Sequence, residues 1–545
     1  MNTPFVELRK LPDHIEGYGR VRPYTGVQAP PLSVTRAATQ MNPARPGVDK
    51  LLKDIDAAFD ACGITSGATL SFHHHLRNGD QVLNAVMAVA AARGLTGLTV
   101  AASSLFPVHA PLVDHMRNSV VTKLFTAYMS GPVADAVSQG VLANPVVMQT
   151  HGGRARAIES GELHIDVAFV AAPAADTFGN LSGSEGPAAC GPLGYAMVDA
   201  MHADRVVGVT DHVCPHPLCP IDISQQWVDF VVPVGSIGDP KGILSGSTRP
   251  TTDPIGLQIA SNAAKVIAAS GLLREGFSFQ TGAGGVSIAA SLYVQELMRE
   301  RKVQGSFGAG GVTGYLVDML EAGLFRTLFD VQCFDLKAVQ SYRDDRRHQA
   351  MSASLYANPH NRGAIVDQLD AMLLGAAEID TDFNVNVTTG ASGRILGGSG
   401  GHADTAAGAK LALVTTRLAA SVGPKIVDRV GCITTPGETI DAVVTEAGVA
   451  VHPRRDDLRD RLLAAGIEVV SIGQLRDRAL AIAGGTTVKS PPMVGARIVG
   501  VVEYRDGRVI DVIRQVPVKG RNAARASSVD SNDITRHDAD AWAAA

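Results

Sequence analysis

The stretch "GATLSFHHHLRNGDQVLNAVMAVAAARG" at residues 67–94 decides the predicted fold of the chain. It begins with a short apolar run, passes through a polar loop with three consecutive histidines, and continues into an Ala- and Val-rich segment of helical length. A strand, a loop and a helix in this order form one unit of an α/β fold. A similar stretch, "GFSFQTGAGGVSIAASLYVQELMRERK", occupies residues 276–302. The chain therefore contains this unit twice.

Two further pairs of segments repeat in the same order, which supports a duplicated α/β unit. Residues 164–191 resemble residues 378–408, and residues 227–240 resemble residues 426–439. Continuous Val- and Ile-rich runs are typical of strands buried on both faces of a parallel sheet. We therefore predict an α/β fold with two similar open α/β domains of one type and an active site in the crevice between them. The predicted division is an N-terminal arm (1–48), a first domain (49–248), a second domain (249–516) and a disordered tail (517–545).

The composition of the 545-residue chain argues against several classes of protein. The net charge is −5 and the basic residues are scattered, so no nucleic-acid partner is expected. No apolar run reaches the roughly 18–20 residues that a membrane helix needs. The N-terminus lacks the apolar core of a signal peptide. We therefore expect a cytoplasmic protein that contacts no membrane.

The six cysteines are spread along the chain and are expected to be reduced thiols. Cys214 and Cys219 lie close together in "HVCPHPLCP", with His212 and His216 beside them. A metal site there would need a second pair of ligands at the usual zinc spacing. A proline-rich loop with buried thiols is the favoured interpretation, and no metal site is predicted.

A polar loop directly follows the first predicted strand, where α/β domains bind their ligands. It contains His73, His74, His75, Arg77 and Asn78. Alternation in an extended segment sends His73 and His75 to one side and His74 to the other. Three interpretations stay open: a metal site, recognition of an anion or carbonyl group, and a solvated loop that caps the next helix.

Glycine-rich loops lead into two predicted helices in the second half and are candidate thioester- or CoA-binding loops. Backbone N–H groups at a helix N-terminus attract oxyanions. The Lys-Ser/Thr pair of a phosphate loop is missing, and the glycine spacing does not match a dinucleotide fingerprint. Neither loop contains a G-x-S-x-G nucleophile elbow. The predicted thioester-binding glycines are Gly282, Gly284 and Gly285 in the first loop and Gly308, Gly310 and Gly311 in the second.

A third glycine-rich loop, "GGSGGHADTAAGAK", occupies residues 397–410. It has too few ligands for a metal and lacks the features of a phosphate loop. We expect Asp404 to orient His402 or to fix the loop, and whether His402 contacts substrate stays open. The glycines predicted to donate backbone N–H groups to a thioester or carboxylate are Gly397, Gly398, Gly400 and Gly401.

Several long segments together resemble the alpha subunit of citrate lyase, from about residue 5 to residue 516. They are "SFHHHLRNGD", "DTFGNLSGSEGPAACG", "GGSGGHADTAAGAK" and "VVEYRDGRVIDVIRQV", the last of which also predicts a hairpin with Asp506 and Gly507 in its turn. "GGSGGHADTAAGA" and "VVTEAGVAVHP" are also similar to elements of the wider superfamily of acetate and 4-hydroxybutyrate CoA-transferases. The resemblance implies two CoA-transferase-type α/β halves.

One departure from the superfamily concerns the catalytic nucleophile. Many of these transferases attack the acyl-CoA with a glutamate and form a covalent intermediate. Counting back from the shared helix at Asp318–Gly323, that glutamate falls near Gly310 or Gly311. The sequence has no carboxylate between Gly305 and Val317. A covalent glutamyl route is therefore not expected.

The resemblance implies a citrate CoA-transferase that exchanges acetate for citrate on an acyl-carrier-protein thioester. It implies no tightly bound cofactor, since the enzyme uses the CoA-like prosthetic group of the carrier protein or acetyl-CoA. The implied partners are the acyl carrier protein (gamma) and citryl-ACP lyase (beta) subunits in an oligomer, with small carboxylic acids as substrates. A stand-alone CoA-transferase using free CoA is the alternative, and a non-catalytic scaffold is a third.

Citrate needs cationic or N–H partners, and several residues of the strand-end loops are candidates. The candidate substrate-binding side chains are His73, Arg77, Asn78, Arg394, His402 and Asp404. The candidate acid–base groups are His75, Glu185 and Glu446. For Glu446, a helix-cap or salt-bridge role is the favoured alternative because burial cannot be deduced from its position.

Overall fold

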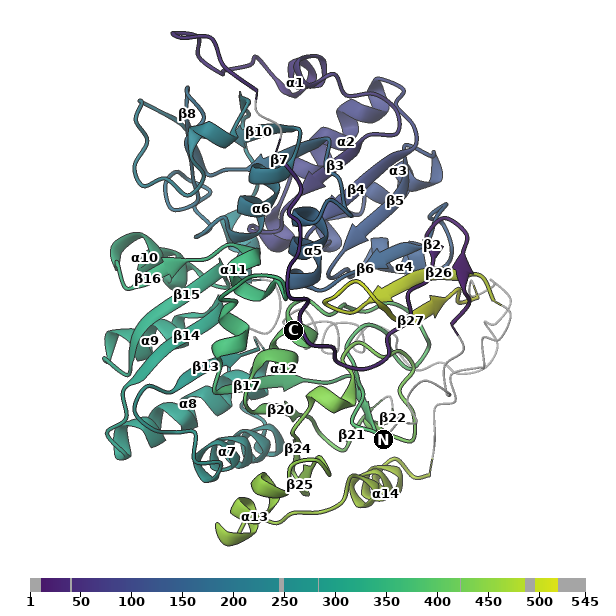
Figure 1. Cartoon of the computed structure of the whole chain (residues 1–545), viewed down its shortest axis with the longest axis vertical. Helices are drawn as coiled ribbons and strands as arrows, with labels where there is room; N and C mark the ends of the chain where they lie inside the picture. Colours follow the sequence, from purple (N-terminus) through teal and green to yellow (C-terminus); the bar gives the residue numbers. More distant parts are fainter. Residues whose placement is uncertain are drawn as a thin grey trace.

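A computed structural model of the chain describes residues 11–39, 42–244, 249–282, 284–421, 423–485 and 496–517. Two large β-sheets lie one above the other in the view of Figure 1, and helices flank both of them. The predicted α/β fold class is therefore confirmed. The predicted disordered tail lies outside the described residues, apart from Pro517.

The first sheet has nine strands, seven of them parallel and followed at one edge by an antiparallel hairpin. Its central strand β3 carries the Leu70 and Phe72 side chains into the core. In spatial order the strands are β12 (Phe230–Pro233), β10 (Arg205–Thr210), β7 (Val167–Ala171), β3 (Thr69–Phe72), β4 (Leu98–Ala102), β5 (Val121–Thr126), β6 (Val146–Met148), β26 (Ile498–Glu503) and β27 (Val509–Arg514).

The second sheet has eight strands, all parallel except its last strand β25. Most of the strands are buried, as the continuous apolar runs of the sequence predict for a parallel sheet. In spatial order they are β16 (His348–Ala350), β15 (Phe325–Cys333), β14 (Gly305–Val312), β13 (Ser278–Thr281), β17 (Ala371–Gly375), β20 (Ala412–Thr415), β24 (Ala442–Thr445) and β25 (Gly448–Val451).

The two sheets share one strand order, so the predicted duplication is confirmed at the level of topology. The segments at residues 67–94 and 276–302 are equivalent, since each forms the central strand and the next helix. The other two predicted alignments are wrong in register. The short strands β8 (Ala174–Asp176) and β18 (Glu378–Asp380) are counterparts, and β12 corresponds to β24.

The C-terminal hairpin forms as predicted, with Gly507 at φ +80° in the turn. Its position is not the predicted one. Strand β26 pairs in parallel with β6, with Gly500 opposite Val146, so the hairpin extends the first sheet. The predicted assignment of the whole span 249–516 to the second domain is therefore wrong for residues 498–514. Sequence periodicity predicts strands, whereas their partners depend on long-range contacts.

Helices cover both sheets, and one hydrophobic core joins them, with Leu70 and Phe279 in the same cluster of buried residues. At the centre, α5 of the first half packs against α11 of the second half. The helices are α1 (Ile55–Cys62), α2 (Val82–Ala92), α3 (Leu112–Arg117), α4 (Pro132–Ser138), α5 (His151–Glu159), α6 (Gly194–His202), α7 (Pro254–Ala269), α8 (Gly285–Glu300), α9 (Gly314–Glu321), α10 (Leu336–Asp344), α11 (Ala353–Ala357), α12 (His402–Gly408), α13 (Asp456–Ala464) and α14 (Ile472–Ile482).

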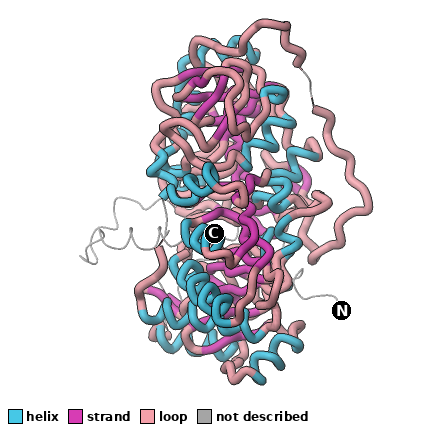
Figure 2. The backbone as a smooth tube through the Cα atoms, turned by 90° about the vertical axis from the view of Figure 1, so that its left-hand side faces the viewer, coloured by secondary structure: helices cyan, strands magenta, loops and turns pink. Residues whose placement is uncertain are grey.

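The N-terminal arm crosses both halves, and Figure 2 shows it as a long loop along one side of the molecule. Backbone hydrogen bonds connect Arg22 and Tyr24 to Val509 of the C-terminal hairpin. The Tyr24 hydroxyl donates to Glu438 of the second half over 2.6 Å. Arm and hairpin together therefore fasten the two halves to each other.

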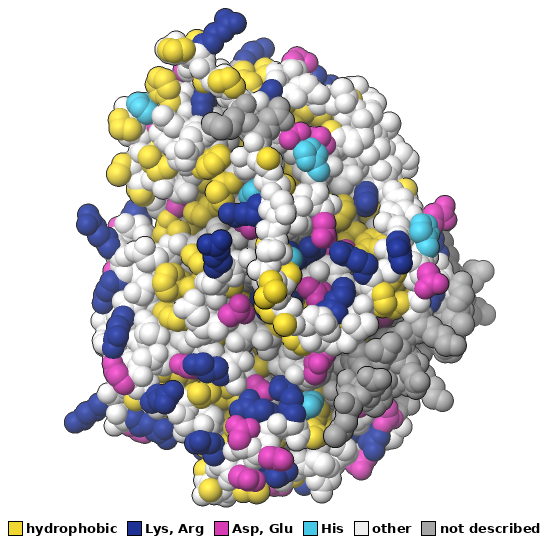
Figure 3. Space-filling model, viewed as in Figure 1, with side chains coloured by type: hydrophobic (Ala, Val, Ile, Leu, Met, Phe, Trp, Pro, Cys, Tyr) yellow, Lys and Arg dark blue, Asp and Glu magenta, His cyan; other side chains and the backbone are white. Residues whose placement is uncertain are grey.

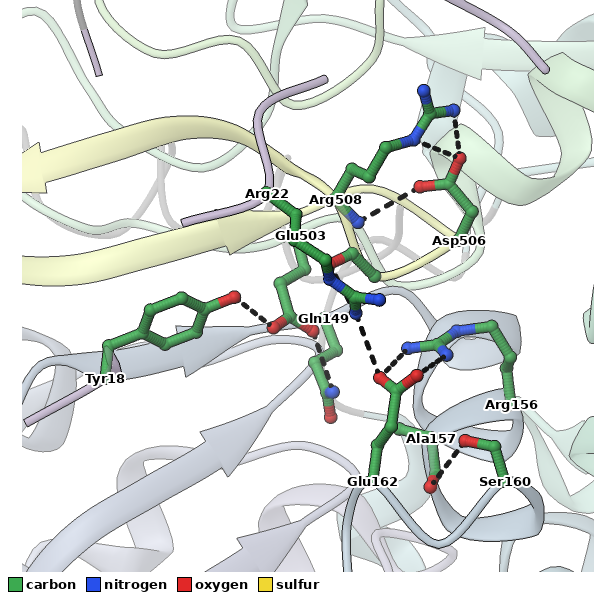
Figure 4. Close-up of polar contacts among 11 residues, drawn as sticks. Tyr18, Arg22, Gln149, Arg156, Ala157, Ser160, Glu162, Glu503, Asp506 and Arg508 are labelled. Atoms are coloured by element: carbon green, nitrogen blue, oxygen red, sulfur yellow. Dashed lines mark hydrogen bonds and ion pairs between the residues drawn. The ribbon is translucent and has the colours of Figure 1, made fainter. Parts of the chain in front are cut away.

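A polar cluster beneath the arm completes this junction (Figure 4). The Glu503 carboxylate accepts hydrogen bonds from the Tyr18 hydroxyl over 2.8 Å and from the Gln149 amide over 3.0 Å. Burial raises the pKa of Glu503. Beside it, the Glu162 carboxylate pairs with Arg156 over two contacts of 2.9 Å. Each of these side chains has at least one hydrogen-bond partner within the cluster, which supports a structural role for the cluster.

The surface shown in Figure 3 carries interspersed basic and acidic side chains. This agrees with the scattered charge of the sequence. Among the described residues, no helix is long and apolar enough to cross a membrane.

Candidate active site

A cavity of about 230 Å³ lies at the carboxyl ends of the central strands of the second sheet. Strands β13, β14, β17 and β20 contribute Gln280, Gly311, Leu374 and Thr415 to its wall. The first half closes it with two side chains, which come from the N-terminal ends of α5 and α6. This position, between the halves and beyond parallel strand ends, is where an α/β protein binds its ligand.

The N-terminus of the 16-residue helix α8 opens into the cavity, which is lined there by Gly284, Gly285, Val286 and Ser287. The first N–H groups of a helix have no partner within the helix, and its dipole favours negative charge at this end. Gly282 also lines the cavity, although its own amide donates to Leu373 O. The predicted loop 282–285 is therefore at the site.

Two aromatic side chains from the first half form the opposite wall, His151 and Tyr195. Their ring centroids lie 4.6 Å apart, and the Tyr195 ring stacks on His74 at the same distance. Burial lowers the pKa of His151 to about 3 and raises that of Tyr195 far above its usual value. Both groups are therefore neutral at physiological pH. Neither residue was singled out from the sequence; His151 is the first residue of α5 and Tyr195 is the second residue of α6.

Two cations, Arg417 and Lys425, line the cavity after strand β20. The Arg417 guanidinium pairs with Asp253 over 2.5 Å, and the Lys425 ammonium donates to Ala376 O over 3.3 Å. Sequence reasoning missed both. Arg417 follows the run "ALVTT" at a strand end, and this was the available signal.

His402 lines the cavity but has no spare polar atom. Its Nδ1 lies 2.7 Å from Thr435 Oγ1, and its Nε2 lies 2.9 Å from Gly375 O. Burial lowers its pKa to about 4, so a neutral ring satisfies both contacts. His402 therefore fixes the surrounding loops, and its contact with substrate stays a prediction.

Asp404 lies in the first turn of α12 and contacts the first half, whereas one alternative of the prediction had it orient His402. Its carboxylate accepts hydrogen bonds from the Thr150 hydroxyl over 2.8 Å and from the Gly152 amide over 2.9 Å. Burial raises its pKa to about 6. Thr150 and Gly152 flank His151, so Asp404 sets the position of that imidazole in the cavity wall.

The histidine loop after β3 lies buried behind the cavity. His73 contacts Asp199 over 2.9 Å, and Arg154 pairs with the same carboxylate. The Arg77 guanidinium lies over the Phe334 ring at 4.8 Å. None of the predicted residues His73, His75, Arg77 and Asn78 lines the cavity; His75 is buried, and Asn78 accepts a hydrogen bond from the Val108 amide.

Most of the other predicted glycine donors need correction because the fold uses their amides. Gly397 N donates to Thr388 O, and Gly400 N donates to Ala127 O. Gly308, Gly310 and Gly311 belong to strand β14, not to a loop, and pair with β15 around a bulge. Of the glycines predicted outside loop 282–285, the two that line the cavity are Gly311 and Gly401, whereas Gly398 packs against Ala127 O.

The three remaining candidates lie outside the cavity wall. Arg394 pairs with Asp135 over 3.2 Å. Glu446 accepts a hydrogen bond from the Leu418 amide over 3.1 Å, as expected for a structural carboxylate. Glu185 also does not line the cavity.

Two groups of possible metal ligands occur in the described part of the chain, and neither is in the cavity. In the buried group, Asp330 accepts from Cys333 and from His348, each over 3.1 Å. The Cys214–Cys219 loop is fastened by His216, whose Nδ1 lies 3.0 Å from Asp176. These contacts satisfy the groups without an ion. The predicted absence of a metal site stays a prediction.

The fold and site define a class of protein: two α/β halves of one topology around a cavity that can bind an anionic substrate. The family model of the citrate lyase alpha subunit matches residues 48–516. The citrate lyase alpha chain of Escherichia coli K12 is 47% identical over 467 residues, 86% of this chain and 91% of that one. The Klebsiella pneumoniae chain is 45% identical over the same length and shares. The chain belongs to the citrate lyase alpha subunit family.

Solved structures agree. A citrate lyase alpha subunit from Streptococcus mutans, in complex with citrate, is 44% identical with a TM-score of 0.87; the match covers 90% of this chain and 96% of that one. The alpha subunit of a malonate decarboxylase from Acinetobacter baumannii shares the fold, with a TM-score of 0.58 at 17% identity over 79% of this chain and 88% of that one. The predicted resemblance is confirmed. The chain is a transferase subunit of citrate lyase, a multisubunit enzyme.

Proposed function

We propose that the cavity between the halves is where citrate replaces acetate on the carrier-protein thioester, with no covalent enzyme intermediate. One observation carries this proposal. Among the described residues that line the cavity, none is a carboxylate or a thiol. At Gly311, a Cβ atom would lie 2.3 Å from the Phe334 ring, so a side chain at this strand end would have to displace Phe334. Citrate itself is then the nucleophile, and the protein positions it.

The anionic substrate has three sources of positive potential in the cavity. Arg417 and Lys425 are full charges, and the N-terminus of α8 adds unpaired N–H groups. Asp253 neutralises part of the Arg417 charge, so the guanidinium is fixed in orientation before citrate arrives. We assign these groups to the carboxylates of citrate, in place of the predicted Arg77 and Arg394.

We assign the thioester to the uncharged part of the cavity wall. His151, Tyr195, Gln280 and Tyr356 are uncharged side chains of the cavity wall. A water-poor, uncharged wall strengthens every interaction with the reacting carbonyl. The CoA-like arm of an acyl carrier protein is the donor we assign, and free acetyl-CoA is the alternative donor.

The wider assembly is also a proposal. We assign the carrier protein (gamma) and the citryl-ACP lyase (beta) as partner subunits, in line with the family. The six cysteines are all free thiols, which supports the cytoplasm as the compartment.

The test uses the purified chain with acetyl-carrier protein, or with acetyl-CoA, and citrate. We expect a citryl thioester and free acetate in equal amounts, detected by mass spectrometry. Borohydride added during turnover should leave the chain unmodified. A reduced glutamyl residue would contradict the direct mechanism, and absence of citryl thioester with both donors would contradict the transferase assignment.

A further inference from the structure

The structure reassigns the groups that stabilise the oxyanion of the exchange. Three of the glycine amides expected for this role are engaged elsewhere, since Gly282, Gly397 and Gly400 donate to backbone carbonyls. Attack on a thioester carbonyl creates an alkoxide that needs hydrogen-bond donors. The N–H groups at the N-terminus of α8 are assigned to the carboxylates of citrate, so side chains of the cavity wall are the candidate donors to the oxyanion.

Tyr356 is the first of these groups. Its hydroxyl accepts a hydrogen bond from the Gln280 amide over 2.8 Å, and both side chains line the cavity. A hydroxyl has one proton to donate. In the described part of the chain no acceptor takes the Tyr356 proton, so Gln280 leaves it free for a ligand. A Cβ atom at Gly401 would lie 2.3 Å from Tyr356 Oη, so only glycine leaves room for the phenol there.

Tyr195 is the second group and comes from the opposite half. Its ring is fixed between His74 and His151, with both centroids 4.6 Å away. The Tyr195 hydroxyl makes no hydrogen bond with any residue that the structure describes, although the residue is 4% exposed and lines the cavity. Burial raises the pKa of both phenols above the usual value, so both retain their protons.

We propose that Tyr195 and Tyr356 form the oxyanion hole of the transferase and that Gln280 positions Tyr356. The inference rests on the proposed function. A citrate carboxylate oxygen bonds to the acetyl carbon, and the carbonyl electron pair moves onto oxygen, where the two phenols donate to it. Collapse breaks the C–S bond and releases the thiolate, leaving an acetyl–citryl anhydride. The thiolate then attacks the citryl carbonyl through a second oxyanion and expels acetate, so no net proton transfer is needed.

The main test replaces each phenol by a ring of the same shape. Tyr356→Phe and Tyr195→Phe should each lower kcat by roughly 10²–10³, the usual effect of removing one oxyanion donor. KM for citrate should change less than threefold, because the ground state does not use these donors. Tyr24→Phe is the matched control, since it also removes a tyrosine hydrogen bond but lies in the arm. Thermal unfolding of each variant separates loss of catalysis from loss of folding.

Gln280 is tested by a double-mutant cycle, since a positioning residue acts through its partner. Gln280→Leu should lower kcat in the wild-type background and add less than threefold in the Tyr356→Phe background. If the kcat losses of the two substitutions are additive, Gln280 does not act through Tyr356, and the positioning role is wrong. If both phenylalanine variants retain kcat within threefold of wild type, the oxyanion hole is wrong. A wild-type protein without exchange activity would instead contradict the proposed function.

Discussion

The two halves share one strand order but differ at the ends of their central strands. Strand β3 runs into His73, His74 and His75, whose rings are buried and fill the space beyond the sheet. Strand β13 ends with Gln280 and Thr281 and is followed by Gly282, and a cavity of about 230 Å³ remains there. The duplicated topology therefore supplies two possible sites, and side-chain volume in one loop leaves only the second open. The first half instead contributes part of the wall of the cavity in the second half.

A second pair of counterparts, two aspartates, differs in pKa. Asp176 and Asp380 occupy equivalent hairpins, and each accepts from the backbone and side chain of an asparagine four residues later. Burial raises the pKa of Asp380 to about 6. Burial acts on Asp176 too, but hydrogen bonds from Leu218, Asn180 and His216 outweigh it and lower the pKa to about 2. Equal local geometry therefore does not give equal titration.

The largest expected effect comes from a substitution in the first half, where buried side chains fill the space beyond the sheet. Asp199→Ala leaves the buried Arg154 and His73 without their shared carboxylate. Removal of one partner of a buried pair costs about 3–5 kcal/mol, because an unpaired charge stays buried. Urea denaturation should show this loss in the free energy of unfolding. Asp344→Ala, which breaks an exposed pair with Arg343, is the control and should cost at most about 1 kcal/mol; equal losses would contradict the comparison.

The next largest effect comes from a substitution that fills part of the cavity in the second half. Gly401→Val places a Cβ atom 2.3 Å from Tyr356 Oη and displaces the phenol. We expect kcat/KM to fall about 10²-fold, as for a misplaced catalytic group, with the circular dichroism spectrum unchanged. Gly473→Ala in α14 is the control, since its nearest Cβ contact is an ordinary 3.8 Å. A folded Gly401→Val protein with more than a third of wild-type kcat/KM would show that this wall does not shape the site.

A smaller effect follows from removing one of the cations that line the cavity. Arg417→Ala should raise KM for citrate about 10- to 100-fold, because a hydrogen bond to a charged group contributes roughly 1.5–3 kcal/mol. Steady-state kinetics at two ionic strengths measures this. Arg326→Ala, an exposed arginine paired with Glu275, is the control and should leave KM unchanged. An unchanged KM in Arg417→Ala would place the carboxylates of citrate elsewhere.

The smallest expected effect is a difference between the two equivalent aspartates in how the free energy of unfolding depends on pH. The folded-state pKa of Asp380 lies above its ordinary value of 3.8, so its stabilisation is complete below about pH 4 and is lost as the pH rises through 6. Asp380→Asn should remove roughly 1–2 kcal/mol of the fall in unfolding free energy between pH 4 and 6. Asp176→Asn should leave that slope unchanged, because Asp176 loses its stabilisation only as the pH falls toward 2. Identical slopes in both variants would contradict the difference.

Much of the fold could be predicted from local patterns. Apolar runs, glycine turns and the repeated strand–loop–helix stretch correctly predicted two α/β units and the hairpin around Gly507. The register of two repeats and the sheet to which β26 belongs could not be predicted, since short strands of similar composition fit several partners. At the site, the loop at Gly282–Gly285 was found by its glycines, whereas His151, Tyr195 and Tyr356 carry no local signature.

The sequence by itself determined the family, the duplicated architecture and the absence of a carboxylate at the end of strand β14. These properties reside in residue identity and order, which need no coordinates. Only the tertiary structure decided which glycine amides are free of internal hydrogen bonds, which histidines line the cavity and which tyrosines face it. Such assignments depend on partners far apart in the chain, as when Asp404 bonds Thr150. Burial and hydrogen-bond pairing exist only once both halves have folded against each other.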